Sequence, residues 1–157
     1  MTHTAPAPTI PTTGSTHLDP VPVNVRVKIS ALWAAMMFVY VYVDLFSLFR
    51  ADIRADLDAG QVWTFTVGQG FLLGVTAYVA IPSLMVFLSL VLPARVARWG
   101  NLVLASVYLL TVVGGAIGET WTYYLLGSAL EVAALAAVIG YAWTWPRVGP
   151  SPADGGR

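Results

Sequence analysis

Two acidic residues inside long apolar segments are the side chains best placed to do chemistry in this 157-residue chain. Asp44 lies in an apolar run at about 29–49, and Glu131 lies in another at about 121–145. Insertion scales put the cost of an acid at the centre of a membrane-spanning helix at about 2.5–3.5 kcal/mol, so such residues usually face a bundle interior or a water-filled cavity. We therefore expect Asp44 and Glu131 to mark a pocket between helices.

Two tyrosines lie at helical spacing from these acids. Tyr40 lies one turn before Asp44, and Tyr124 lies two turns before Glu131, so each pair shares a helix face. No Lys, Arg or His lies at the same depth to neutralise the acids. We predict a substrate-binding site formed by Asp44, Glu131, Tyr40 and Tyr124, where water, a proton or a bound cation compensates the carboxyl groups.

The overall composition is typical of a membrane protein. Apolar residues make up 57% of the chain and charged residues 10%, with a mean hydropathy of +0.73. Soluble domains have roughly 45–50% apolar and 25% charged residues. The formal net charge is zero, so no basic field attracts nucleic acid. The lipid bilayer is therefore the first expected partner.

The chain offers few ligands for a metal or a redox cofactor. It has no cysteine, and its two histidines, His3 and His17, both precede the apolar segments. Those segments therefore lack the thiolates and imidazoles that usually hold zinc, haem or iron–sulfur clusters. We expect no metal, no cofactor and no catalytic residue, because there is also no nucleophile motif.

Apolar runs of about 20 residues predict an all-α membrane domain with four spanning helices. We place the spans at about 29–49, 67–92, 99–117 and 121–145.

The segments outside these runs are polar. Residues 50–60 alternate charged and apolar residues, which suits a short interfacial segment. The membrane domain is expected over 25–147, between a Pro/Thr-rich disordered tail at 1–24 and a second disordered tail at 148–157.

The second apolar run contains Pro82, which removes one backbone hydrogen bond. That helix should bend near Tyr78, whose carbonyl loses its partner. The side chains of Tyr78 and Gln69 could donate hydrogen bonds to the pocket. Glu119, just after the third run, is expected near the vestibule at the outer opening of this pocket.

Two G-x-x-x-G patterns suggest how the helices pack. Gly70 and Gly74 lie in the second span, and Gly114 and Gly118 lie at the end of the third. Small residues at this spacing allow two backbones to approach closely. The second and third spans are therefore expected to pack through these glycines.

Basic residues indicate the orientation. Five of them fall on one side of a four-span chain: Arg26, Lys28, Arg95, Arg98 and Arg147. Only Arg50 and Arg54 fall on the other side, among several acids. By the positive-inside rule, we expect a four-helix bundle in a bacterial inner membrane with both termini in the cytoplasm.

Several segments resemble a family of small bacterial four-span membrane proteins whose function is unknown. They are Val27-Lys28-Ile-Ser-Ala-Leu-Trp33, Tyr42-Val-Asp44, Ile81-Pro82-Ser-Leu-Met85-Val-Phe-Leu-Ser89, Arg98-Trp99-Gly-Asn101, Glu131-Val and Tyr141-Ala-Trp-Thr-Trp145. The likeness covers about 27–145 and implies a four-helix bundle without implying an activity. DoxX-like four-helix membrane proteins offer a more distant analogy.

Two functions stay open at this point. One is a non-enzymatic membrane protein that binds or moves a small solute or a proton through a pocket near Asp44 and Glu131. The other is a non-catalytic structural or interaction subunit, either as a homo-oligomer or within a larger membrane complex.

Overall fold

The computed structural model describes residues 22–146, and every contact given below lies within that range. The structure is helical apart from one small hairpin, which confirms the predicted all-α class. In chain order its elements are α1 (Val25–Ser47), α2 (Ala51–Asp58), β1 (Gln61–Val62), β2 (Phe65–Thr66), α3 (Gln69–Val91), α4 (Ala94–Ala116) and α5 (Thr122–Trp143). The tails expected at 1–24 and 148–157 lie outside the described residues except for 22–24, and His3 and His17 lie outside them too.

Within residues 22–146, four helices are long and apolar enough to cross a membrane: α1, α3, α4 and α5. Each has 22 or 23 residues, which gives a length of about 33–35 Å. Their outer faces carry large apolar side chains such as Phe38, Leu73 and Leu110, which are 69%, 70% and 73% exposed. Faces of this kind are suited to contact with lipid.

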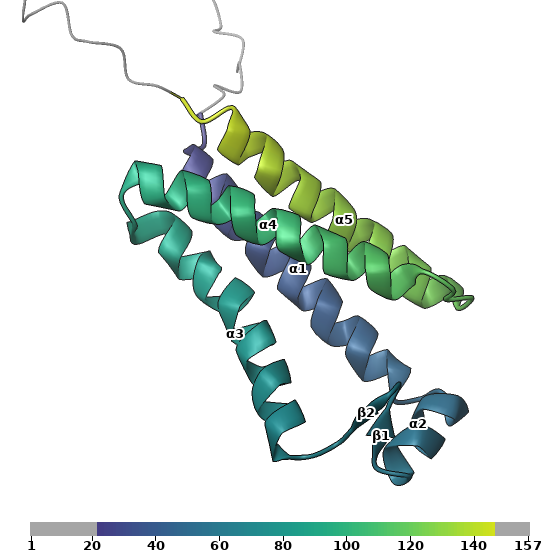
Figure 1. Cartoon of the computed structure of the whole chain (residues 1–157). Helices are drawn as coiled ribbons and strands as arrows, with labels where there is room; N and C mark the ends of the chain where they lie inside the picture. The colour runs from purple at the N-terminus through teal and green to yellow at the C-terminus, as the bar shows by residue number, and fades with distance from the viewer. Residues whose placement is uncertain (1–21, 147–157) are drawn as a thin grey trace, which may run out of the picture.

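Buried residues at three- and four-residue spacing pack α1, α4 and α5 together, with α5 in contact with both of the others (Figure 1). On α5 this stripe consists of Gly127, Glu131, Leu135, Val138 and Ala142. The same spacing recurs on α1 and α4, because residues three and four apart lie on one face of a helix. α3 packs mainly on α1 and has little contact with α4.

A glycine allows α1 and α5 to approach closely. A Cβ at Gly127 would overlap a methyl group of Val43 and lie 3.6 Å from the Val43 Cβ. Val43 is β-branched and therefore has little rotational freedom in a helix. A larger residue at position 127 would force the two helices apart.

The expected packing of the second and third spans through G-x-x-x-G patterns is wrong for this chain. A Cβ at Gly70, Gly74, Gly114 or Gly118 would meet no other atom within 4 Å. The physical reason is that α3 leans on α1, so its glycines face no neighbouring helix. The stretch 69–77 is exposed throughout, apart from the half-buried Phe71.

The structure differs from the prediction in two further places. α4 begins at Ala94, immediately after Pro93, and not near Trp99, so the expected loop over 93–98 is largely helical. Proline is well tolerated at the start of a helix, where its missing N–H is not needed. The segment 50–60 does form the helix α2, but the hairpin of β1 and β2 that follows it was not predicted. Its turn holds Trp63 at a φ of 55°, a rare conformation for a large residue.

The end of the bundle away from the hairpin is held by polar contacts. The Trp33 indole N–H donates to Asn101 Oδ1 over 2.6 Å, and the Ser89 hydroxyl donates to the same oxygen over 3.1 Å. Arg26 donates to two carbonyls at the end of α3, and Arg98 donates to two at the end of α5. These basic side chains thereby satisfy carbonyls that lack partners within their own helices.

Candidate binding site between α1, α3 and α5

Glu131 is a buried acid without a partner. It lies on the inner stripe of α5, one turn before Leu135, and is only 4% exposed. No hydrogen bond or ion pair within residues 22–146 involves its carboxyl group. Every fully enclosed polar side-chain atom in this range does have a hydrogen-bond partner. The Glu131 oxygens are therefore not fully enclosed by the protein.

Asp44 belongs to the same site but is exposed. It lies one turn after Tyr40 on α1, and its carboxylate interacts electrostatically with Tyr78 on α3 and with Tyr124 and Glu131 on α5. Groups from three helices therefore surround one region. The structure brings together the four residues that the sequence singled out. That they bind a substrate stays a prediction.

The two predicted tyrosines have different surroundings. Tyr40 is half-buried, and its ring lies 6.2 Å from that of Tyr78 between the ring centres. Tyr124 is also half-buried, but its hydroxyl points toward α4, where it would lie 3.2 Å from a Cβ placed at Gly115. Tyr40 is therefore the tyrosine that faces the opening between α1 and α3.

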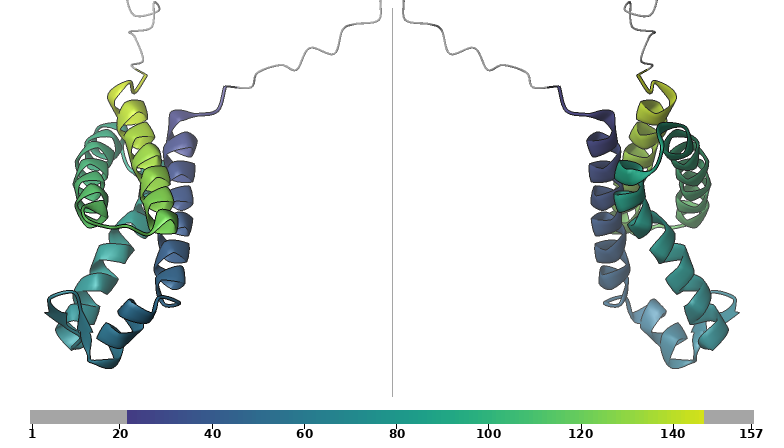
Figure 2. Two further views of the ribbon diagram at one scale, coloured as in Figure 1. Left: turned by 90° about the vertical axis from the view of Figure 1, so that its right-hand side faces the viewer. Right: turned by 90° about the vertical axis from the view of Figure 1, so that its left-hand side faces the viewer.

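That opening is a cleft of about 500 Å³ beside Tyr40 and Tyr78. Figure 2 shows α1 and α3 diverging toward α2 and the hairpin, which bridge their ends. We call this the hairpin end of the bundle. The cleft is lined by Tyr40, Phe65, Thr66, Gly70, Phe71, Gly74, Val75 and Tyr78. Its walls are thus aromatic, apolar or weakly polar. Asp44 and Glu131 are not among the lining residues, and Asp44 lies one turn beyond Tyr40 on α1.

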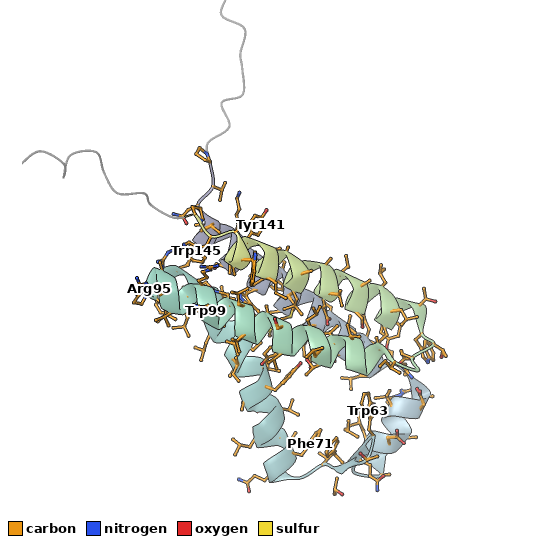
Figure 3. The ribbon with its side chains drawn as sticks, turned by 45° about the horizontal axis from the view of Figure 1, so that its top comes forward. Trp63, Phe71, Arg95, Trp99, Tyr141 and Trp145 are labelled. Carbon is orange, nitrogen blue, oxygen red and sulfur yellow. The ribbon has the colours of Figure 1, made fainter. Side chains whose placement is uncertain are left out.

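Two aromatic lining residues were not identified from the sequence. Phe65 on β2 and Phe71 on α3 stack with their ring centres 6.0 Å apart. Figure 3 shows Phe71 on the side of α3 that faces the hairpin, while Trp99, Tyr141 and Trp145 gather at the opposite end of the bundle. No local signal indicated the two phenylalanines, because the hairpin that brings them together was itself not predicted.

Pro82 explains why a cleft can exist here. Proline has no N–H to donate to the carbonyl of Tyr78, four residues earlier. In the structure the Tyr108 hydroxyl on α4 donates to that carbonyl. The Tyr78 hydroxyl in turn pairs with the Thr111 hydroxyl over 2.6 Å. α4 thus holds α3 at Tyr78, and the part of α3 before Tyr78 leaves the bundle (Figure 1).

Glu119, which was expected near the opening of the pocket, forms an ion pair with Arg50 instead. Arg50 donates to its Oε2 over 2.9 Å and forms a bidentate pair with Asp52. The backbone N–H groups of Thr120 and Trp121 donate to its other oxygen. These contacts connect the turn after α1 to the turn before α5. They form a clamp at the hairpin end, which we call the Arg50 clamp.

The charges of the Arg50 clamp stabilise one another. The hydrogen bond from Arg50 lowers the pKa of Glu119 below its ordinary value, as it also does for the exposed Asp52. The bond to Asp52 raises the pKa of the Arg50 guanidinium. Arg50 also lies over the Trp121 ring at 4.8 Å. With its charge satisfied in this way, Arg50 is not available to Asp44 or Glu131.

The described residues show no arrangement for a metal. Among residues 22–146, no three of His, Asp and Glu lie close enough together to hold an ion. The chemistry open to the site is therefore that of two carboxyl groups and several phenols. It can accept hydrogen bonds, exchange protons and attract a positive charge.

Fold and site together define a class: a bundle of helices long and apolar enough to cross a membrane, with a cleft lined by aromatic side chains and a buried acid on a neighbouring helix. A family model described as a family of unknown function (DUF6326) matches residues 23–149. The match covers most of the chain, so this chain belongs to that family. The predicted resemblance to a family of unknown function is thereby confirmed. No curated protein and no solved structure matches the chain, and the analogy to DoxX-like proteins finds no support.

Proposed function

We propose that this protein is a non-enzymatic membrane protein that binds or moves a small solute or a proton at a site formed by Asp44, Glu131, Tyr40 and Tyr124. The observation that carries the proposal is the isolation of Glu131, which is 4% exposed and has no bonded partner within residues 22–146. An ionised acid left unpaired in a bundle interior is costly. A proton or a bound ligand would remove that cost.

We test access to the site with dicyclohexylcarbodiimide, a small apolar reagent that adds covalently to carboxyl groups in apolar surroundings. In detergent-purified protein, mass spectrometry should show one reagent per chain, attached at Glu131. The label should disappear in Glu131→Gln and persist in the control Asp56→Asn, which removes an exposed acid of α2. A folded protein in which Glu131 never reacts has no open pocket, and this result would refute the proposed function.

Transport is tested separately in liposomes with an entrapped pH indicator. If the site moves protons, an imposed pH gradient should collapse faster with the wild-type protein than with Asp44→Asn or Glu131→Gln. Equal rates for all three proteins, at matched incorporation, would exclude proton movement through these acids and leave binding of a solute.

The proposal includes an orientation in a bacterial inner membrane with both termini in the cytoplasm. It is supported by the gathering of Arg26, Lys28 and Arg98 at the end away from the hairpin. Because the chain has no cysteine, single cysteines can report the sides. Asp56→Cys should react with a membrane-impermeant maleimide on intact cells, and Ala94→Cys only after permeabilisation. The reverse pattern would invert the orientation.

A second candidate, a structural or interaction subunit, is favoured by the uncovered first half of α3. Residues 69–77 are exposed apart from the half-buried Phe71, and no helix of the described chain covers their glycines. A photoreactive crosslinker at Leu73→Cys should then join the chain to a specific partner or to a second copy in native membranes. Recovery of uncrosslinked monomer alone would count against this role.

A further inference from the structure

We propose that the ligand of this site is a lipid-soluble organic cation, whose apolar body lies in the cleft between α1 and α3 and whose positive charge approaches Asp44 and Glu131. This inference rests on the proposed function, because it names the chemical class of the solute.

The negative charge that the two acids carry when ionised is uncompensated. Neither Asp44 nor Glu131 takes part in an ion pair within residues 22–146. Arg50, one of the two arginines at the hairpin end, is paired with Asp52 and Glu119, and the other, Arg54 on α2, forms no ion pair with either acid within residues 22–146. A cationic ligand would supply the missing counter-charge, whereas an anion would add to the repulsion.

The walls of the cleft suit an organic cation better than a metal ion. Four of the residues that line it carry aromatic rings: Tyr40, Phe65, Phe71 and Tyr78. Aromatic faces attract organic cations and also bury their apolar parts. Hard metal cations instead require six or more oxygen ligands, and no three acids cluster in the described chain.

Size and access are consistent with a ligand that arrives through lipid. The cleft volume of about 500 Å³ falls in the range of pockets for drug-sized molecules. It opens beside the first half of α3, where Leu72 and Leu73 are 55% and 70% exposed. If these side chains face lipid, a molecule already dissolved in the membrane can enter sideways. The ligand must then combine a positive charge with enough apolar surface to enter a bilayer.

Two probes of nearly equal shape and opposite charge test this inference. Tetraphenylphosphonium is a lipophilic cation, and tetraphenylborate is its anionic counterpart. Equilibrium dialysis against protein in detergent micelles, corrected with empty micelles, gives the affinity for each. We expect tetraphenylphosphonium to bind at least about tenfold more tightly, since one nearby unscreened acid can supply more than the energy of a tenfold change.

Variants assign the binding to the site. Glu131→Gln and Asp44→Asn should each weaken tetraphenylphosphonium binding several-fold, and Asp56→Asn should not change it. Asp44 is exposed, so its substitution by Asn is not expected to disturb folding. Tetraphenylphosphonium, but not tetraphenylborate, should also slow the reaction of Glu131 with dicyclohexylcarbodiimide.

The outcomes separate the ligand class from the function. If Glu131 reacts with carbodiimide but tetraphenylborate binds as tightly as tetraphenylphosphonium, or neither probe binds, the cation inference is wrong and the solute-binding site remains. If binding of tetraphenylphosphonium is the same in Asp44→Asn and Glu131→Gln as in the wild type, the cation binds elsewhere and the inference is also overturned. An unreactive Glu131 removes the proposed function itself.

Discussion

The contact between the Tyr108 hydroxyl and the Tyr78 carbonyl yields the sharpest quantitative prediction. Pro82 leaves this carbonyl without its usual donor, and Tyr108 supplies a replacement from α4. Tyr108→Phe removes only the hydroxyl. The ring contacts with Tyr78 and Trp33, at centre distances of 4.7 and 6.1 Å, can be kept. The measured effect should therefore report the hydrogen bond alone.

The size of the effect follows from leaving one acceptor without a donor. A buried polar group that loses its partner costs about 1–3 kcal/mol, and interhelical side-chain hydrogen bonds in membrane proteins reach at most about 1.7 kcal/mol. We expect Tyr108→Phe to lower the free energy of unfolding by about 1–2 kcal/mol. In the Pro82→Ala background the cost of Tyr108→Phe should be smaller, because residue 82 then has an N–H that can donate to the Tyr78 carbonyl.

A double-mutant cycle therefore measures the coupling. In the Pro82→Ala background, Tyr108→Phe should cost less than about 0.5 kcal/mol, close to the limit for independent sites. The assay is a titration with sodium dodecyl sulfate in mixed micelles, followed by tryptophan fluorescence and circular dichroism. Tyr42→Phe, which alters an exposed tyrosine, is the matched control. An equal cost of Tyr108→Phe in both backgrounds would refute the idea that Tyr108 replaces the donor lost at Pro82.

Three further predictions concern packing and charge. Gly127→Ala should lower the unfolding free energy by about 1–3 kcal/mol through overpacking against Val43, and Val43→Ala should restore part of the loss. Asn101→Leu should cost about 1–3 kcal/mol, because the buried indole N–H loses its acceptor. The pKa of Glu119 is lowered in the folded state. The stabilisation that the ionised Glu119 gives the folded protein is therefore complete above a pH of about 4.5, its ordinary pKa, and is lost as the pH falls through the lowered pKa. Thermal unfolding between pH 7 and 3 should therefore show a smaller acid-induced decrease for Glu119→Gln, and an unchanged decrease would contradict the contact with Arg50.

The sequence by itself determined the helices and the position of the buried acid. Four apolar runs of about 20 residues predict helices, because a segment of this kind that enters lipid must satisfy its backbone groups within itself. Glu131 shares its face with Leu135 and Val138, so any bundle that buries these residues also turns the acid inward. The lost partner of the Tyr78 carbonyl likewise follows from the covalent structure of Pro82. These features depend only on local geometry.

Only the tertiary structure decided which helices touch and where the bundle stays open. The glycines at 70 and 74 could have packed against any helix, and in the fold they pack against none. The donor that reaches Tyr78 comes from Tyr108, 30 residues away, and nothing in either local sequence indicates the other. The cleft depends on the hairpin that places Phe65 beside Phe71 and on the divergence of α3 from α1. Such contacts are set by how whole helices pack, because side-chain periodicity shows which face is buried but not which neighbour covers it.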